Sequence, residues 1–379
     1  FETYQIVNPG NIILRLTDLQ NDKKSLRVGI VKEKGIITSA YLCLNTQHIY
    51  AQYAYKLLHN YDILKVFYNM GSGIRQNMNF KDLKRLPILV PPPEEQKAIA
   101  HFLDHKLEQI EQYIRNKQRL IELLNEQKTA IINRAVTKGI NPNVPMKHSG
   151  IEWLGEIPVH WEVIPLTKNL SSLVDYRGKT PEKIESGIFL VTAKNIKNGS
   201  INYEISKEYI SENNYFEIMR RGLPKIGDIL FTTEAPLGEV ANVDFEQIAL
   251  AQRIIKFRVQ ENILNPYFVK LLIMSSFFQN QIQQEATGST AQGIKASKLH
   301  KLKILKTSID EQEQIVKYID FKNRETDQAI AQIEKEIELI QEYRTTLISD
   351  AVTGKIDVRG FDNSSNSRNS PKPPELATM

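Results

Sequence analysis

The sequence predicts an α+β protein made of two tandem repeats, each a mixed α/β domain followed by a long helix. Three observations lead to this fold class. The string Ala-Val-Thr ends two long amphipathic stretches, at 135–137 and again at 351–353, 216 positions later. At that separation the chain matches itself without gaps from 83 to 137. Upstream of each helical stretch, strand-like runs alternate with turns rich in glycine and asparagine. A repeat this long indicates a duplicated domain rather than a solenoid.

The self-match includes polar positions that chance would not align. Glu95-Gln96 meets Glu311-Gln312 at the separation of 216. Further upstream the separation becomes 217, and Gly10-Asn11-Ile12 meets Gly227-Asp228-Ile229. Each repeat therefore has a variable front part and a similar back part.

The back parts predict helices of about 40 residues, or roughly 60 Å if straight. Apolar residues of the second helix follow a 3-4-3 spacing at Ile330, Ile333, Ile337, Ile340 and Leu347. The first helix places Ile114, Lys117, Ile121, Leu124 and Ile131 in the same register, and Lys128 and Arg344 at matched seam positions. Two such stripes most simply pack on each other. A coiled coil that serves only dimerisation is the alternative. Ser308 and Glu311 frame a capping box, and Gly139 and Gly354 suit helix C-caps.

In the front parts we expect strands at 36–44, 227–232 and 250–259, and short helices at 50–58 and 266–278. The predicted domains are a first mixed α/β domain (1–90), a central helix region (91–140), a linker (141–158), a second mixed α/β domain (159–307), a distal helix region (308–358) and a disordered tail (359–379).

Composition excludes several classes of protein. A single cysteine, Cys43, excludes a disulfide framework within the chain and metal sites built on several cysteines. No apolar run reaches the roughly 20 residues of a membrane span, and no signal peptide is visible, so we expect a cytoplasmic protein. The net charge of +5 and the pI near 8.9 permit nucleic-acid binding without requiring it.

Catalytic motifs are weak. Asn265-Pro266-Tyr267-Phe268 lacks the second proline of an adenine methyltransferase site and is better interpreted as a helix start. No Walker loop is present. Asp104-x-Lys106 and Asp320-x-Lys322 lie in helical patterns, where residues two apart face different sides; they indicate solvated helix surface rather than a nuclease site. The histidines show no metal-ligand spacing.

A set of longer strings resembles the specificity subunit of type I restriction–modification systems. They are PPPEEQKAIAHFLD (91–104), IEWLGEIPVHW (151–161), YRGKTP (176–181), LVTAKNIKNG (190–199), GDILFTTEAPLGEVA (227–241), GSTAQGIKASKLHKLKI (288–304), IDEQEQIVKYID (309–320) and the two Ala-Val-Thr endings. The resemblance covers almost all of residues 1–358.

The resemblance implies a non-catalytic DNA-binding subunit for DNA methylation and host defence. Its two target-recognition domains would each read half of a bipartite double-stranded DNA site. The long helices would form an antiparallel coiled coil with a pseudo-two-fold axis, docking two methyltransferase subunits and, through them, the restriction (translocase/nuclease) subunits. S-adenosylmethionine, Mg and ATP are expected on those partners and no cofactor on this chain. The second repeat opens near Trp161, so by analogy the first would begin about 56 positions before Phe1. We therefore expect the first recognition domain to be N-terminally truncated, without a counterpart of YRGKTP.

The functional alternative is a structural coiled-coil adaptor that assembles methyltransferase subunits, with impaired or non-specific DNA reading. A fused methyltransferase–nuclease is disfavoured by the missing motifs.

DNA-contacting residues are predicted from their type and loop context, because Lys and Arg bind phosphates and Arg, Lys, Asn and Gln also read base edges. In the first repeat these are Arg15, Thr17, Thr38, Ser39, Ser72, Arg75, Gln76 and Asn77. In the second they are Arg177, Lys179, Thr180, Lys194, Asn195, Lys197, Gln252, Arg253, Ser289, Thr290, Gln292 and Lys295. For each single residue, an ordinary solvent-exposed loop is the alternative. Partner contacts are predicted around Lys97, His101, Lys106, Lys317 and Lys322 on the helices.

Overall fold

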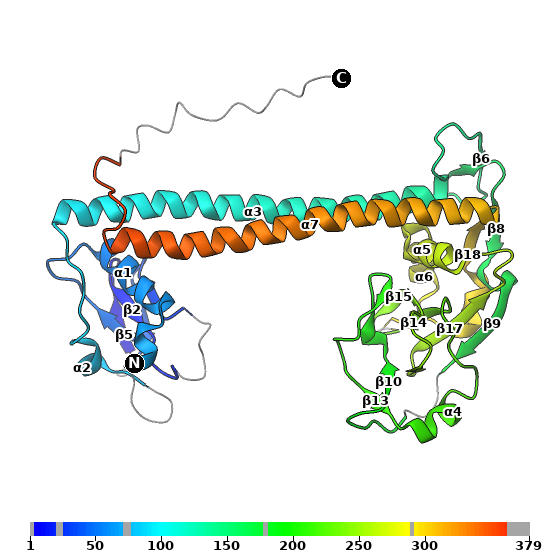
Figure 1. The fold of residues 1–379 in the computed structure, drawn as a ribbon, viewed down its shortest axis with the longest axis horizontal. Helices are drawn as coiled ribbons and strands as arrows, with labels where there is room; N and C mark the ends of the chain where they lie inside the picture. The colour runs from blue at the N-terminus through cyan, green and yellow to red at the C-terminus, as the bar shows by residue number, and fades with distance from the viewer. Residues whose placement is uncertain (1–3, 20–25, 71–76, 177–180, 289–291, 362–379) are drawn as a thin grey trace. The chain divides into compact units, whose positions relative to one another are not determined.

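The computed structural model describes residues 4–19, 26–70, 77–176, 181–288 and 292–361. The chain divides into two compact units. The N-terminal unit contains residues 1–120 and 331–379, and the central unit contains residues 121–330. Figure 1 shows the elements of each unit.

The N-terminal unit holds small antiparallel sheets covered by a helix. Its strands are β1 Tyr4–Val7, β2 Ile12–Leu14, β3 Val28–Ile30, β4 Gly35–Thr38 and β5 Leu42–Leu44, and its short helices are α1 Ala51–Ile63, η1 Val66–Asn69 and α2 Phe80–Leu83. β2 lies between β3 and β5, while β1 pairs with β4. Ile12 and Leu14 of β2 are fully buried and share a core with Ala54 and Leu58 of α1.

The central unit is larger and has two cores. A four-stranded antiparallel sheet has the order β15-β14-β17-β9, and a three-stranded sheet has the order β13-β10-β16, in which β10 and β16 run parallel. The strands of the two sheets are β9 Leu170–Asp175, β10 Ile188–Val191, β13 Tyr209–Ile210, β14 Ile229–Thr233, β15 Leu237–Asn242, β16 Ile248–Leu250 and β17 Ile254–Val259.

Paired short strands complete the unit: β6 Met146–His148 with β7 Glu156–Pro158, β8 Glu162–Pro165 with β18 Lys303–Lys306, and β11 Ile196–Lys197 with β12 Ser200–Ile201. Its short helices are η2 Leu166–Asn169, η3 Ala193–Asn195, η4 Glu212–Asn214, α4 Tyr215–Ile218, α5 Pro266–Met274, α6 Ser276–Glu285 and η5 Ala296–Lys301. In Figure 1, α5 and α6 lie between the four-stranded sheet and the start of α7.

Two long helices, α3 Pro93–Lys138 and α7 Ile309–Val352, each contribute one part to the N-terminal unit and the other part to the central unit. In the N-terminal unit Arg344 lies 3.5 Å from Glu111, and Lys117 lies 2.6 Å from Glu336. Because higher numbers on α3 meet lower numbers on α7, the two helices are antiparallel. The predicted seam is confirmed: Ile333 and Leu347 are buried, and the other seam positions are partly buried. The polar seam residue Lys128 forms an ion pair with Asp327 in the central unit at 2.6 Å.

The duplication is confirmed by matching turns before β2 and β14. Asn11 Oδ1 accepts a hydrogen bond from the Asn8 N–H at 2.8 Å, and Asp228 Oδ2 accepts one from the Lys225 N–H at 2.9 Å. The preceding glycines, Gly10 and Gly227, have φ values of +91° and +89°, which favour glycine. Residues 217 positions apart in the sequence therefore occupy equivalent places in the two structural repeats.

A buried glutamine at the start of each long helix ties it to the neighbouring domain. Gln96 accepts a hydrogen bond from the Tyr50 N–H at 2.7 Å, where α1 begins. Gln312 accepts one from the Asn265 N–H at 2.8 Å, where α5 begins. Gln312 also donates to the carbonyl oxygens of Ile263 and Thr307, and Gln96 donates to that of Pro91. The side chains of Gln96 and Gln312 are 2% and 0% exposed. They provide hydrogen-bond partners for backbone groups that would otherwise be buried without one.

Some local predictions are confirmed and others are wrong. Asn265 caps α5 with Pro266 in its first turn, as expected, and Gly139 and Gly354 have φ values of +75° and +74°. The predicted strand at 36–44 is wrong as a single element, because β4 and β5 belong to different sheets. The run 250–259 is likewise divided between β16 and β17, and the helix 266–278 ends at Met274 before α6 begins.

The capping box at Ser308 forms by half. Ser308 Oγ accepts from the Glu311 N–H at 3.3 Å, but the Glu311 carboxylate instead accepts from Trp161 Nε1 at 3.1 Å and from the Thr307 hydroxyl. Across the described ranges, no helix combines the length and apolarity needed to cross a membrane.

We predict that Gln312→Ala lowers the free energy of unfolding by about 1–3 kcal/mol, because it leaves the Asn265 N–H and two carbonyl groups buried without partners. Urea denaturation of the full chain measures this loss. The matched control is Gln314→Ala, two positions along α7 and exposed, which should change stability little. Equal losses in both variants would contradict the assigned role of Gln312.

Candidate nucleic-acid interface

The crossover from β16 to β17 carries two of the predicted DNA-contacting residues. β16 ends at Leu250 beside β10, and the Ala251 N–H then donates to the Val191 carbonyl at 2.9 Å. β17 begins at Ile254 in the other sheet. Gln252 and Arg253 therefore span the junction of the two sheets. Arg253 adopts φ +76°, and its carbonyl accepts hydrogen bonds from the N–H and hydroxyl of Thr233 at 2.9 and 3.1 Å.

A second predicted loop meets the same strand end from the other side. The Ile294 N–H donates to the Thr233 carbonyl at 3.0 Å, and Gly293 forms an antiparallel bridge with Glu234. A Cβ at Gly293 would lie 3.2 Å from the Thr233 oxygen, so this close approach favours glycine. The structure therefore brings Arg253 and the neighbourhood of Gln292 to opposite sides of one strand end.

A concave surface of about 240 Å³ lies at this junction. Its polar lining comprises Lys183, Thr192, Lys194, Glu208, Gln252 and Arg253, and its apolar lining comprises Leu190, Ala193, Ala235 and Ala251. Three of the sequence-predicted residues, Lys194, Gln252 and Arg253, are thus brought together. Sequence reasoning missed Lys183 and Glu208, which form an ion pair at 2.7 Å. Their signal was weak, because neither belongs to a recognisable turn or glycine motif.

The side chains on this surface have the chemistry of DNA readers. Arginine binds phosphate or the O6 and N7 atoms of guanine, and a glutamine amide pairs with adenine N6 and N7. Arg253 Nε lies 2.9 Å from Glu234 Oε1, with both side chains more than two-fifths exposed. Such an exposed ion pair contributes little stability, so the guanidinium can exchange its partner at small cost.

Other predicted residues of the central unit lie outside this concave surface. Lys197 on β11, Gln292 and Lys295 are exposed. The prediction that Asn195 contacts DNA is wrong, because this side chain is fully buried. Its Oδ1 accepts from the N–H and hydroxyl of Thr192 at 2.9 and 2.7 Å, and its Nδ2 donates to the Asn202 carbonyl at 3.0 Å. Asn195 therefore holds the loop together and does not face solvent.

In the N-terminal unit, backbone contacts join two predicted segments. Asn77 Oδ1 accepts a hydrogen bond from the Asp18 N–H at 2.7 Å. This contact brings Asn77 close to the segment that contains Arg15 and Thr17. The buried guanidinium of Arg27 donates to the carbonyl oxygens of Arg15 and Thr17 at 3.4 and 2.6 Å. The Arg15 side chain is exposed. Thr38 and Ser39 are also exposed, at the end of β4, and no contact joins them to this group among the described residues.

The remaining predicted contacts lie outside the described residues. They are Ser72, Arg75, Gln76, Arg177, Lys179, Thr180, Ser289 and Thr290.

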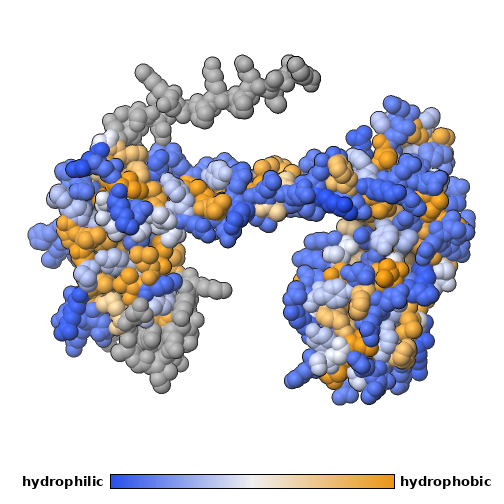
Figure 2. Space-filling view, in the orientation of Figure 1, coloured by the Kyte–Doolittle hydropathy of each residue, from blue (hydrophilic) through white to orange (hydrophobic). Residues whose placement is uncertain are grey.

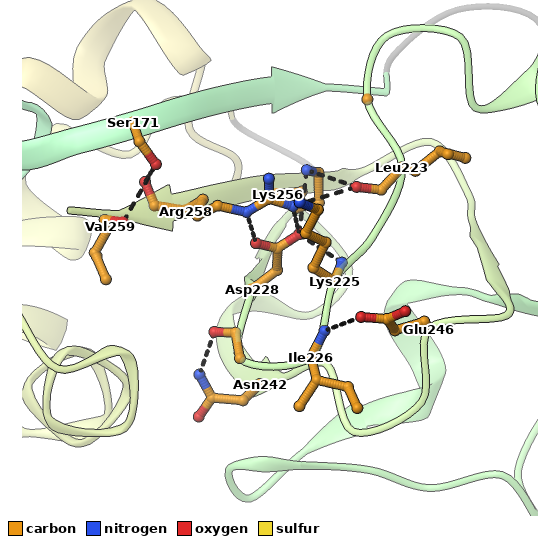
Figure 3. Close-up of polar contacts among 12 residues, drawn as sticks. Ser171, Leu223, Lys225, Ile226, Asp228, Asn242, Glu246, Lys256, Arg258 and Val259 are labelled. Carbon is orange, nitrogen blue, oxygen red and sulfur yellow. Dashed lines mark hydrogen bonds and ion pairs between the residues drawn. The ribbon is translucent and has the colours of Figure 1, made fainter. Parts of the chain in front are cut away.

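A buried charge cluster supports the four-stranded sheet of the central unit (Figure 3). The Arg258 guanidinium donates two hydrogen bonds to the Asp228 carboxylate. Nε donates to Oδ1 at 2.6 Å, and a terminal nitrogen donates to Oδ2 at 2.8 Å. Lys256 Nζ lies 3.2 Å from Asp228 Oδ2, and both side chains are 1% exposed. Burial lowers the pKa of Lys256, and the Asp228 carboxylate opposes that shift. These basic groups bind Asp228 and the Leu223 carbonyl, so their role is structural.

The predicted partner-contacting residues lie on the long helices. Lys97 and His101 are exposed on α3 and Lys106 is half-buried, while Lys317 is exposed and Lys322 half-buried on α7. At repeat-matched separations, His101 corresponds to Lys317 and Lys106 to Lys322. Exposed Tyr318 and Phe321 lie between the two α7 lysines in sequence, and sequence reasoning missed them.

Residues 9–123 and 158–339 match the family described as "Type I restriction modification DNA specificity domain". The chain belongs to this family. It is similar to the type I restriction enzyme MjaVIII specificity subunit of Methanocaldococcus jannaschii, with 26% identity over 373 residues, covering 94% of this chain and 81% of that protein. The EcoBI specificity subunit of Escherichia coli is 21% identical over 300 residues, covering 76% of this chain and 62% of its own length.

Solved structures show the same fold. A chain from a study of "complex assembly and conformational transition of the type I R-M system" superposes with a TM-score of 0.68 at 13% identity, covering 93% of this chain and 84% of its own. The HsdS subunit of Thermoanaerobacter tengcongensis gives a TM-score of 0.51 at 14% identity, covering 93% and 82%. The protein is thus a specificity subunit of a type I restriction–modification system, the non-catalytic component responsible for DNA sequence recognition.

We predict that Asp228→Ala destabilises the specificity subunit by about 3–5 kcal/mol, because it leaves the Lys256 ammonium buried without its counter-ion. Thermal or urea unfolding measures the loss. The double variant with Lys256→Met also removes the unpaired buried charge, so it should recover part of the stability. The control Glu212→Ala removes an exposed carboxylate from the same unit. If the double variant is no more stable than Asp228→Ala, the Lys256 charge is not the source of the loss.

Proposed function

We propose that this specificity subunit reads a bipartite DNA site, one half with the domain at 1–90 and the other with the domain at 159–307, while the helical regions 91–140 and 308–358 hold the methyltransferase subunits. The segments 141–158 and 359–379 are assigned as linker and tail. The observation that carries this proposal is the convergence of Lys194, Gln252 and Arg253 on one concave surface. A cytoplasmic location, with access to chromosomal DNA, is part of the proposal.

The crossover supports direct reading by Arg253. Its carbonyl is fixed by two hydrogen bonds from Thr233, so the backbone position is held while the side chain stays exposed. With the backbone already fixed, only side-chain conformational entropy is lost when Arg253 binds a base edge. Gln252 occupies the adjacent position, and Lys194 adds a cation for a phosphate.

In the N-terminal unit we assign DNA contacts to Arg15, Thr17 and Asn77. The argument is the same, because the buried Arg27 fixes the carbonyls of this loop and leaves the Arg15 side chain exposed. Thr38 and Ser39 are assigned as additional contacts on their exposed strand end. In the central unit, Lys197, Gln292 and Lys295 are assigned to flanking phosphate or base contacts.

For the methyltransferase partners, the surface of α7 around Lys317 and Lys322 is the more specific candidate. Phe321 is 57% exposed and Tyr318 is 39% exposed. Aromatic anchors flanked by charged residues are typical of protein–protein interfaces. The repeat-related surface of α3 contains Lys97, His101 and Lys106, and we assign it to the second methyltransferase subunit. The restriction subunits would join through the methyltransferase subunits.

We predict that Arg253→Ala weakens binding to the specific DNA site by about 1–3 kcal/mol, because it removes a base-reading guanidinium. Filter binding or anisotropy with the assembled methyltransferase complex measures this, on the site found by methylome mapping and on random duplex. Arg220→Ala, an exposed arginine elsewhere in the unit, is the control. Equal effects of Arg253→Ala and Arg220→Ala would contradict the assignment. Salt-sensitive binding without any sequence preference would favour the adaptor alternative instead.

We predict that Lys317→Glu together with Phe321→Ser lowers affinity for the methyltransferase subunit about tenfold or more, because it removes an aromatic anchor and reverses a charge. Co-purification and titration calorimetry measure this. Lys335→Glu with Leu339→Ser is the control, since both side chains are exposed on the same helix. Unchanged partner binding in the first variant would remove this surface from the interface.

A further inference from the structure

Glu208 is the one acidic side chain among the described residues that line the concave surface at the sheet junction. It directly precedes β13, the edge strand beside β10, and its carbonyl oxygen accepts a hydrogen bond from the Leu190 N–H at 2.8 Å. The backbone of Glu208 is therefore fixed to the three-stranded sheet, on the same concave surface as Gln252 and Arg253.

The position of Glu208, and not its charge alone, distinguishes it from other acidic residues. Figure 2 shows that most of the visible surface of the central unit is hydrophilic, so an acidic residue on this surface is common. Glu204 is an example: its side chain is 82% exposed, pairs with Lys207 and lies outside the lining of the concave surface. Glu208, in contrast, is half-buried within that lining.

The Glu208 carboxylate has a fixed orientation but incomplete hydrogen bonding. Its Oε1 accepts a hydrogen bond from the Ser206 hydroxyl at 3.0 Å. Its Oε2 lies 2.7 Å from Lys183 Nζ, in an ion pair that lacks hydrogen-bond geometry. Oε2 is thus a buried acceptor without a donor among the described residues, and buried polar atoms rarely remain in this state. The Lys183 side chain is 48% exposed, so it can move to a phosphate when another donor reaches Oε2.

A carboxylate on a DNA-reading surface is selective because most groups that DNA presents repel it. The phosphates are anions, and in the major groove guanine N7 and O6, adenine N7 and thymine O4 are all acceptors. Only cytosine N4 and adenine N6 donate, and adenine places its N7 acceptor beside that donor. A carboxylate therefore favours cytosine, and repulsion excludes the other bases.

We propose that Glu208 is a specificity-determining residue that reads one cytosine in the half-site bound by the central unit. This inference rests on the proposed function, because it requires the concave surface to face base edges. Oε2 accepts a hydrogen bond from cytosine N4, while Lys183 moves from the carboxylate to a neighbouring phosphate. Arginine favours guanine and glutamine favours adenine, so Glu208 supplies a base preference that Arg253 and Gln252 do not.

The test measures the base preferences of the assembled methyltransferase complex by selection of bound duplexes from a random DNA library, followed by sequencing. Glu208→Gln keeps the size of the side chain and an acceptor for the Ser206 hydroxyl, but its amide can also donate to guanine or adenine. We expect this variant to lower the preference for cytosine about fivefold or more at one position of one half-site, and to leave the other positions unchanged.

Two further variants sharpen the test. Glu208→Asp retains the charge and withdraws the carboxylate by one methylene group, so it should weaken the same cytosine preference. Glu204→Gln is the matched control, because it makes the same chemical change on the same loop outside the concave surface, and every position should keep its preference. Circular dichroism melts show whether each variant remains folded.

The inference and the proposed function fail through different results. If the unaltered complex selects a motif that Glu208→Gln and Glu208→Asp both leave unchanged, Glu208 reads no base, although Arg253 can still do so. An equal loss of affinity for all duplexes, with a lower melting temperature, also overturns the inference, because it assigns Glu208 a structural role. If the unaltered complex selects no motif, the proposed function fails and the inference fails with it.

Discussion

The two buried glutamines at the starts of the long helices are the constraint on which the architecture depends. Gln96 and Gln312 each connect the start of a long helix to the N-cap residue of the neighbouring recognition-domain helix. Because the amide both donates and accepts, its satisfaction specifies an orientation, which apolar packing alone does not. Ion pairs along α3 and α7 then fix their register within each unit. A DNA-reading domain is useful to a docked enzyme only if its orientation is defined, and these glutamines define it locally.

Within the central unit, some basic and amide side chains are bound inside the fold, while others of the same residue types are exposed. Arg258 and Lys256 form ion pairs with Asp228, and Asn195 forms hydrogen bonds within its own loop. These polar groups therefore stabilise the fold. Arg253 lies at a crossover where hydrogen bonds hold the backbone, and its side chain forms only an exposed ion pair with Glu234. The proposed base contact of Arg253 depends on this combination, because a fixed backbone restricts the positions that its guanidinium can reach.

Periodicity and repetition predicted the duplication, the helical seam, the glycine caps and the start of α5, while the antiparallel orientation of the helices followed from the family resemblance. The strand crossover at Gln252-Arg253 was not predicted, because 250–259 was expected to be a single strand and Arg253 is a non-glycine residue at positive φ. The burial of Asn195 was also hidden, since an asparagine beside two lysines has the composition of a DNA-reading loop. Burial is a tertiary property, and only the packing of 202–206 around its amide determines it.

Differences between the two repeats show where their surfaces have separate roles. On α3, Phe102 and His105 pack against Phe361, with ring centroids 5.1 and 5.6 Å apart. Their repeat-matched residues on α7, Tyr318 and Phe321, are exposed. The reverse holds just before each helix, where Ile304 of β18 is buried in the central unit and the repeat-matched Ile88 is exposed. Since one ancestral sequence specifies both copies, an apolar position buried in one and exposed in the other retains the chemistry of an interface. The duplication thus acts as an internal control, because it identifies apolar positions that are covered in one copy and exposed in the other.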